Sequence, residues 1–214
     1  MNFPAMRAAM VDSQLRTNSV TQPDVVAAFA AVLREDFVPD DRSARAYADA
    51  PIALGGGRKL NPPLATARLI AEAGLLPGHH VLVVGAATGY ACAVIAKLVK
   101  AVTGLECDPA LATAARQALG NVANATIVEG RLSEGYPDLA PYDVIVIDGA
   151  VEQVPATLAQ QLGDAGRLVA GLTEHGVTRL VKGMRAGDGV SLVSFADGEA
   201  VPLPGFAPSP QFSF

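Results

Sequence analysis

The segment VLVVGAATGY, residues 81–90, decides the fold. Four apolar residues, Val81 to Val84, end at Gly85, and a run with helical character opens at Tyr90. A short uncharged run that turns at a glycine into a helix is typical of a strand buried on both faces. The segment therefore predicts the first strand-turn-helix unit of a parallel sheet.

The same alternation continues along the chain. Further strands are predicted at 102–105, 126–128, 144–147 and 168–169, with helices at 90–99, 109–119 and 155–162, the last two stopped by Gly120 and Gly163. Strands separated by helices run parallel in a doubly wound sheet. The apolar segments 179–184 and 190–195 flank a turn at 186–189, which predicts an antiparallel hairpin at the sheet edge. The expected fold class is α/β, with a mostly parallel, seven-stranded sheet.

Before this series the pattern is helical. Thr21 and Asp24 have the spacing of a capping box, which predicts a helix that ends before Pro39. Asn61 and Pro62 predict a second helix start, with the glycine-rich residues 55–59 before it as a loop. We expect a single domain, with residues 1–75 as a helical extension and acceptor loop, 76–174 as the core, and 175–214 as the edge hairpin and Pro-rich tail.

Composition limits the function classes. Half of the 214 residues are apolar and 17% are charged, which excludes a disordered chain. The 16 basic and 21 acidic residues give a net charge of −5, so nucleic acid is not an expected partner.

Cysteine and hydropathy patterns bear on the compartment. Cys92 and Cys107 are the only cysteines, without the spacing of a zinc site or the density of a disulfide scaffold. The start of the chain lacks the long apolar run of a signal peptide, and the longest uncharged stretch, 81–96, is shorter than the about 20 residues of a membrane span. We therefore expect a cytoplasmic monomer with no membrane partner and no metal.

The ligand site of such a sheet lies beyond the carboxyl ends of its strands. Gly85 and Gly89 allow a tight turn there, and Glu106 ends the second strand, where a carboxylate accepts ribose hydroxyls. Ala87 and Tyr90 stand where a dinucleotide fingerprint has glycines, and a phosphate-binding loop would need Gly-Lys-Ser/Thr. The turn GAATG is closer to a loop for S-adenosylmethionine, which carries no phosphate. The alternative interpretation is a plain strand-to-helix turn beside a surface carboxylate.

Several segments together resemble one family. They are MVDSQLRT (10–17), LREDFVPDD (33–41), AYADAPIALGGGRKLNPP (46–63), VLVVGAATGY (81–90), PYDVIVIDGAVEQVPATLAQQL (141–162) and AGRLVAGL (165–172). In order and spacing the chain is similar to protein-L-isoaspartate O-methyltransferases. The resemblance implies the fold of class I S-adenosylmethionine-dependent methyltransferases, and methyl transfer to the carboxylate of isoaspartyl residues in damaged proteins or peptides.

The resemblance also implies roles for particular residues. A carboxylate acceptor is already deprotonated at neutral pH, so the site needs positioning groups and no general base. Asn61 stands where the family has a hydroxyl residue near the transferred methyl, although an asparagine before prolines also suits a helix cap. The implied acceptor-binding residues are Arg58, Lys59 and Leu60. The implied cofactor-binding residues are Gly85, Ala86, Ala87, Gly89, Tyr90, Glu106, Gly130 and Arg131.

Four positions depart from the family pattern: Asn61 for the hydroxyl residue, Val83 for an acid, Ala87 for the middle glycine, and Arg131 for the acid that holds adenine. All four lie at cofactor or acceptor contacts. Two alternatives therefore stay open beside the repair enzyme. One is a catalytically silent family member that serves in binding, and the other is a methyltransferase with a different, small-molecule acceptor.

Overall fold

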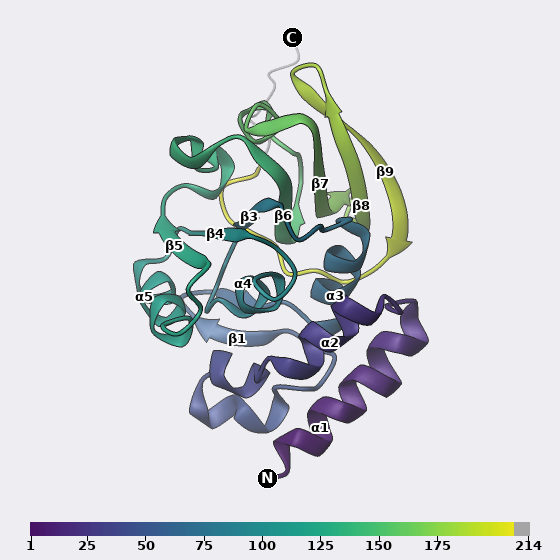
Figure 1. The fold of residues 1–214 in the computed structure, drawn as a ribbon, viewed down its shortest axis with the longest axis vertical. Coiled ribbons are helices and arrows are strands. Elements are labelled where there is room, and N and C mark those ends of the chain that lie inside the picture. The colour runs from purple at the N-terminus through teal and green to yellow at the C-terminus, as the bar shows by residue number, and fades with distance from the viewer. Residues whose placement is uncertain (208–214) are drawn as a thin grey trace.

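A seven-stranded sheet forms the centre of the protein (Figure 1). The computed structural model describes residues 1–207, so the last part of the predicted Pro-rich tail lies outside the described residues. The strand order is β5-β4-β3-β6-β7-β8-β9; the first five are mutually parallel, and β8 and β9 are antiparallel additions at one edge. The strands are β3 (His80–Val84), β4 (Ala101–Glu106), β5 (Ala125–Glu129), β6 (Tyr142–Val151), β7 (Leu162–Glu174), β8 (Val177–Ala186) and β9 (Gly189–Asp197). The predicted fold class and edge hairpin are confirmed.

The helices between the strands are shorter than predicted. They are α3 (Pro63–Glu72), α4 (Tyr90–Ile95), α5 (Pro109–Ala118) and α6 (Ala156–Ala159). The helix predicted from 155 to 162 is present but covers only Ala156–Ala159, and Gly163 is not its stop, because Leu162 already begins β7. The Gln161 carbonyl accepts a hydrogen bond from the Tyr142 N–H at 2.8 Å, and Leu162 pairs with Tyr142.

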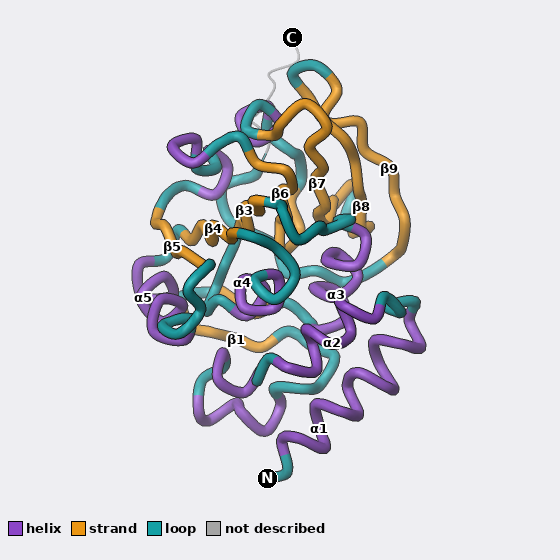
Figure 2. Tube along the Cα trace, viewed as in Figure 1, coloured by secondary structure: helices purple, strands orange, loops and turns teal. Residues whose placement is uncertain are grey.

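The amino-terminal extension is built from several short helices. It begins with α1 (Phe3–Met10), a π-helical segment at Val11–Leu15 and a 3₁₀ turn at Arg16–Asn18. Helix α2 (Pro23–Ala31) and 3₁₀ turns at Arg34–Phe37 and Asp40–Arg45 follow. The capping box predicted at Thr21 and Asp24 was wrong: α2 begins at Pro23 after Gln22, without a side-chain cap. Figure 2 shows these helices gathered below the sheet, with the β7–β9 strands at the upper right.

A separate two-stranded hairpin precedes α3. Strands β1 (Ile52–Gly55) and β2 (Arg58–Leu60) pair antiparallel, where the sequence predicted a loop. Gly55, Gly56 and Gly57 all have positive φ angles, of 100°, 55° and 79°, so the three glycines supply the turn. Alternation along β2 buries Arg58 and Leu60 and exposes Lys59.

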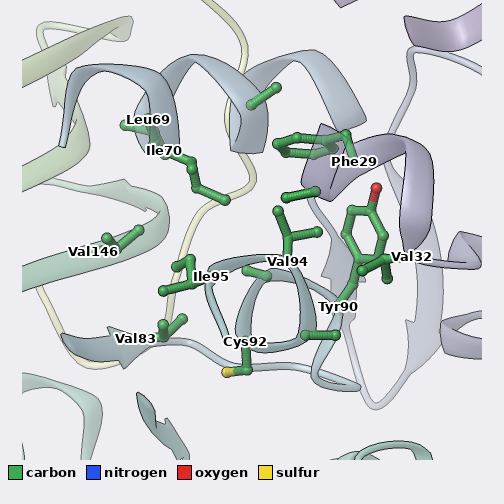
Figure 3. Packing of buried hydrophobic residues seen from close by; sticks show 14 of the residues in the cluster. Phe29, Val32, Leu69, Ile70, Val83, Tyr90, Cys92, Val94, Ile95 and Val146 are labelled. Atoms are coloured by element: carbon green, nitrogen blue, oxygen red, sulfur yellow. The ribbon is translucent and has the colours of Figure 1, made fainter. Parts of the chain in front are cut away.

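The core around α4 joins the extension to the sheet (Figure 3). Tyr90 packs edge-on against Phe29 of α2 and Phe37, with ring centroids 6.1 and 5.6 Å away. On the other side of α4, Ile95 lies between Val83 of β3 and Ile70 of α3. The extension thus shares its apolar core with the sheet. No helix within residues 1–207 is long and apolar enough to cross a membrane.

Candidate functional site

The predicted cofactor turn lies at the carboxyl end of β3. Gly85 and Gly89 have positive φ angles of 81° and 95°, and Ala87 also lies in the left-handed region at 50°. The N–H groups of Gly85 and Ala86 both donate to the Leu105 carbonyl at 3.0 Å. This bond holds the turn against the end of β4, where Glu106 lies.

Glu106 is fully buried and its carboxylate accepts hydrogen bonds from four strong donors. Its Oε1 accepts from the N–H groups of Cys107 (2.8 Å) and Asp108 (3.1 Å). Its Oε2 accepts from the N–H of Ala87 at 2.7 Å and from the Arg58 Nη2 at 2.7 Å. Glu106, predicted to bind the ribose, therefore lies at the end of β4 as expected. Besides backbone N–H groups, the Arg58 side chain donates to it.

The β1–β2 hairpin brings Arg58 to this acid. The Arg58 guanidinium is 8% exposed and forms a salt bridge with Glu106, while its Nε has no hydrogen-bond partner. The hairpin turn also lies close to the loop after β4, since a Cβ built on Gly56 would be 3.3 Å from the Asp108 Oδ2. The hairpin thus covers the end of β4.

Asn61 follows the hairpin and is buried. Its Nδ2 donates to the Asp148 Oδ1 at 2.9 Å, and its Oδ1 accepts from the Val201 N–H at 2.9 Å. Helix α3 begins at Pro63 behind Pro62 and has no side-chain cap. The helix-cap interpretation of Asn61 was therefore wrong: the amide uses its donor and acceptor in contacts between distant segments.

Asp148 lies in β6 and is 4% exposed. The same oxygen that accepts from Asn61 also accepts from the Thr66 hydroxyl at 2.8 Å. Burial raises the pKa of the Asp148 carboxyl, and the hydrogen bonds from Asn61 and Thr66 oppose that rise. Within residues 1–207 no group of three or more His, Cys, Asp or Glu side chains gathers around a possible metal position.

Arg34 was not recognised from the sequence. It is fully buried, its Nε donates to the Ala46 carbonyl at 2.7 Å, and its Nη2 donates to the Asn61 carbonyl at 2.5 Å. Its guanidinium lies 4.4 Å from the centre of the Tyr90 ring. Burial raises the pKa of Tyr90 to about 12. The local sequence gave no signal, because Arg34 is followed by two further charged residues, Glu35 and Asp36.

The segment 200–206, called the closing segment below, was also missed. The Ala150 N–H donates to the Val201 carbonyl at 2.7 Å, and the Leu203 N–H donates to the Ala150 carbonyl at 2.9 Å. The Leu203 side chain lies over two glycines, since a Cβ built on Gly85 or Gly149 would be 2.8 or 2.6 Å from its carbon atoms. The closing segment therefore packs over the chain at Gly85, after β3, and at Gly149 of β6.

The remaining predicted residues are spread around this centre. Leu60 is buried, Lys59 is exposed on the outer face of the hairpin, and Tyr90 lies in the core below the turn. The Gly130 N–H donates to the Glu106 carbonyl at 3.1 Å. Arg131 points to solvent and pairs with Glu134 at 3.0 Å. Cys107, next to Glu106, is exposed.

The residues present fit S-adenosylmethionine under one condition. The turn after β3 carries two glycines with positive φ angles, Gly85 and Gly89, and a carboxylate stands at the end of β4, where the hydroxyls of a ribose would lie. The condition concerns Glu106, whose accepting positions are filled within the protein, one of them by Arg58.

Comparisons with known proteins agree over most of the chain. The family model described as Protein-L-isoaspartate(D-aspartate) O-methyltransferase matches residues 6–202. A protein-L-isoaspartate O-methyltransferase from Roseiflexus castenholzii is 35% identical over 207 residues, covering 96% of this chain and 94% of the relative. A protein-L-isoaspartate O-methyltransferase from Methylorubrum populi is 37% identical over 186 residues, covering 86% of this chain and 87% of the relative.

A solved structure from Plasmodium falciparum, described as a beta-aspartate methyltransferase in complex with S-adenosyl-L-homocysteine, has a similar fold. Its TM-score is 0.78 at 17% identity, covering 94% of this chain and 97% of that chain. At this identity the likeness shows the fold.

Proposed function

The chain belongs to the protein-L-isoaspartate O-methyltransferase family, and we propose that it transfers the methyl group of S-adenosylmethionine to isoaspartyl carboxylates in damaged proteins. The observation that carries the proposal is the position of Glu106. A buried carboxylate ends β4 beside the glycine turn of β3, in a chain that matches the family from residue 6 to 202.

The cofactor would lie across the ends of β3, β4 and β5. Gly85, Ala86, Ala87 and Gly89 would border its methionine end, and Glu106 would accept the ribose hydroxyls. Gly130 and Arg131 would lie beside the adenine, with Tyr90 supporting the turn from below. S-adenosylmethionine supplies an electrophilic methyl group on a sulfonium.

The acceptor side would be formed by the hairpin and the residues after it. A carboxylate acceptor is ionised at neutral pH, so this side has to orient an oxygen and exclude water. Arg58, Lys59 and Leu60 would border the acceptor. Asn61 would act as a positioning residue, because its side chain holds Asp148 and the closing segment in place.

The proposal extends to partners and compartment. Isoaspartyl-containing proteins or peptides are the partners, and the net charge of −5 gives no general attraction to nucleic acid. Cys92 and Cys107 are both free thiols, which suits a reducing cytoplasm. We propose that the chain acts there as a monomer.

The test is label transfer from methyl-labelled S-adenosylmethionine. An isoaspartyl peptide and its normal aspartyl twin are compared, and we expect label on the isoaspartyl peptide alone. Equal labelling of both peptides, or label on neither, would contradict the proposed acceptor. Calorimetric titration tests the cofactor separately, and no heat at millimolar S-adenosylmethionine would remove the enzyme interpretation.

A catalytically silent binding protein is the second candidate. Two observations favour it. Arg58 forms a salt bridge with Glu106, the acid proposed to bind the ribose, and the Asn61 amide forms its hydrogen bonds with Asp148 and Val201 inside the protein. The same titration separates the two candidates. A methyltransferase for a small molecule would bind the cofactor but leave both peptides unlabelled.

A further inference from the structure

The Glu106 carboxylate has no free capacity for a ribose. A carboxylate accepts about four hydrogen bonds through its two oxygens. In this chain three come from backbone N–H groups, those of Ala87, Cys107 and Asp108, and the fourth comes from Arg58. A ribose would bring two further hydroxyl donors to the same oxygens, so at least one present donor has to leave.

Arg58 is the donor that is free to leave. The three backbone N–H groups belong to the turn after β3 and the loop after β4, where Asp108 also caps α5 by accepting from the Ala110 N–H at 2.9 Å. Arg58 instead reaches the acid through a flexible side chain. Its guanidinium makes one hydrogen bond, through Nη2, and its Nε is buried without a partner.

Electrostatics makes this exchange costly. Arg58 and Glu106 are both buried, and separating a buried ion pair leaves an uncompensated charge unless new partners replace it. Ribose hydroxyls satisfy the Glu106 oxygens but do not neutralise their charge. Cys107, next to Glu106, is exposed, so a displaced guanidinium can reach water at this edge.

We infer that Arg58 sets the affinity of this chain for its cofactor by competing with the ribose hydroxyls for Glu106. The inference rests on the proposed function, since it takes S-adenosylmethionine as the ligand. It assigns Arg58 a place on the cofactor side of the site, as a positioning residue that acts through Glu106. The expected consequence is weak cofactor binding that strengthens when the Arg58 guanidinium is removed.

The experiment is calorimetric titration of the whole chain and three variants. Arg58→Gln removes the charge, Arg58→Lys keeps it, and Arg16→Gln, which removes the arginine of an exposed ion pair with Asp12, is the control. The probes are S-adenosylmethionine, adenosine and 2′,3′-dideoxyadenosine, which lacks both ribose hydroxyls. Thermal melting of each variant checks that it is folded.

We expect Arg58→Gln to bind S-adenosylmethionine and adenosine about tenfold more tightly than the unchanged chain. The affinity for dideoxyadenosine should stay the same, and Arg58→Lys and Arg16→Gln should behave like the unchanged chain. Unchanged or weaker adenosine binding by Arg58→Gln overturns the inference. An equal gain for dideoxyadenosine also overturns it, because a general structural change would not depend on the hydroxyls.

A second measurement uses the unchanged chain. In a crystal grown with S-adenosylhomocysteine, the Arg58 guanidinium should have left Glu106, and a retained ion pair overturns the inference whatever the variants do. Failure of the proposed function is seen separately. Tighter binding by Arg58→Gln with no label on the isoaspartyl peptide leaves the inference standing and removes the proposed acceptor. If the unchanged chain labels the isoaspartyl peptide but Arg58→Gln binds the cofactor no more tightly, the proposed function stands and the inference is overturned.

Discussion

Asn61 and Asp148, 87 positions apart in the chain, share a buried hydrogen bond of 2.9 Å. Asn61 follows the β1–β2 hairpin and Asp148 lies in β6, so the bond ties the hairpin to the sheet. The other end of the amide accepts from Val201, which ties in the closing segment as well. One side chain therefore joins three parts of the site.

Replacing Asn61 by serine should remove both of these buried hydrogen bonds. We expect the free energy of unfolding to fall by about 1–3 kcal/mol, because buried partners are left unpaired. We also expect turnover on an isoaspartyl peptide to rise, since the smaller hydroxyl opens space for the acceptor. Urea unfolding and label transfer measure the two effects. Asn121→Ser, at an exposed position, is the control, and equal stability of the two variants would contradict the role given to Asn61.

Glu106→Ala should lower cofactor affinity by about tenfold, roughly 1.4 kcal/mol, because the ribose loses its acceptor. It should also destabilise the protein, because Arg58 is left buried without a counter-charge. Titration calorimetry and thermal melting measure these effects. Glu129→Ala is the matched control, since Glu129 ends the next strand in register with Glu106 but is exposed. Unchanged affinity in Glu106→Ala would mean that the cofactor lies elsewhere.

The strands could be predicted from the sequence because each is a short apolar run that ends at a glycine or an acid. Glu106 was placed correctly at its strand end for the same reason. The β1–β2 hairpin was missed because three consecutive glycines give no strand signal, although they are what the turn requires. The partners of Asn61 and Glu106 depend on tertiary contacts, Asp148 and Arg58, that no local pattern shows.

Asp148 should make stability depend on pH. Burial raises its pKa in the folded state above the value in the unfolded chain, so between these two values the folded state binds more protons. Its contribution to stability is therefore largest below the unfolded pKa, falls as the pH rises to the folded pKa, and is constant above it. In Asp148→Asn this decline should disappear. Melting temperatures of both proteins from pH 4 upward measure it, and parallel curves would contradict the prediction.

Gly149→Ala should push the closing segment away from β6. A Cβ at this position would lie 2.6 Å from the Leu203 Cγ and 2.7 Å from the Val201 carbonyl oxygen, so the backbone has to move. We expect a loss of about 1–3 kcal/mol in the free energy of unfolding, as for other overpacked sites. Gly78→Ala, with open space around the added carbon, is the control. A similar stability for both variants would show that the segment is not packed as described.

Cys107 should report cofactor binding. It is exposed beside Glu106, whereas Cys92 is buried, so a thiol reagent should modify Cys107 first. Partial burial and the Glu106 carboxylate raise the pKa of the Cys107 thiol, so the rate should rise with pH into the alkaline range. Saturating S-adenosylmethionine should slow the reaction by covering this edge. Cys107→Ser identifies the reacting thiol, and a rate unaffected by the cofactor would contradict the site.

The buried Arg34 has a consequence for how the molecule comes apart. Its guanidinium lies against Tyr90 at the start of α4 and donates to Asn61, while its own backbone belongs to the amino-terminal extension. If the extension alone unfolded, the Arg34 guanidinium would lose its buried partners, and the aromatic cluster around Tyr90 would be exposed. The parts before and after the predicted boundary near residue 75 therefore depend on each other for stability. We expect both to unfold on heating in one cooperative transition.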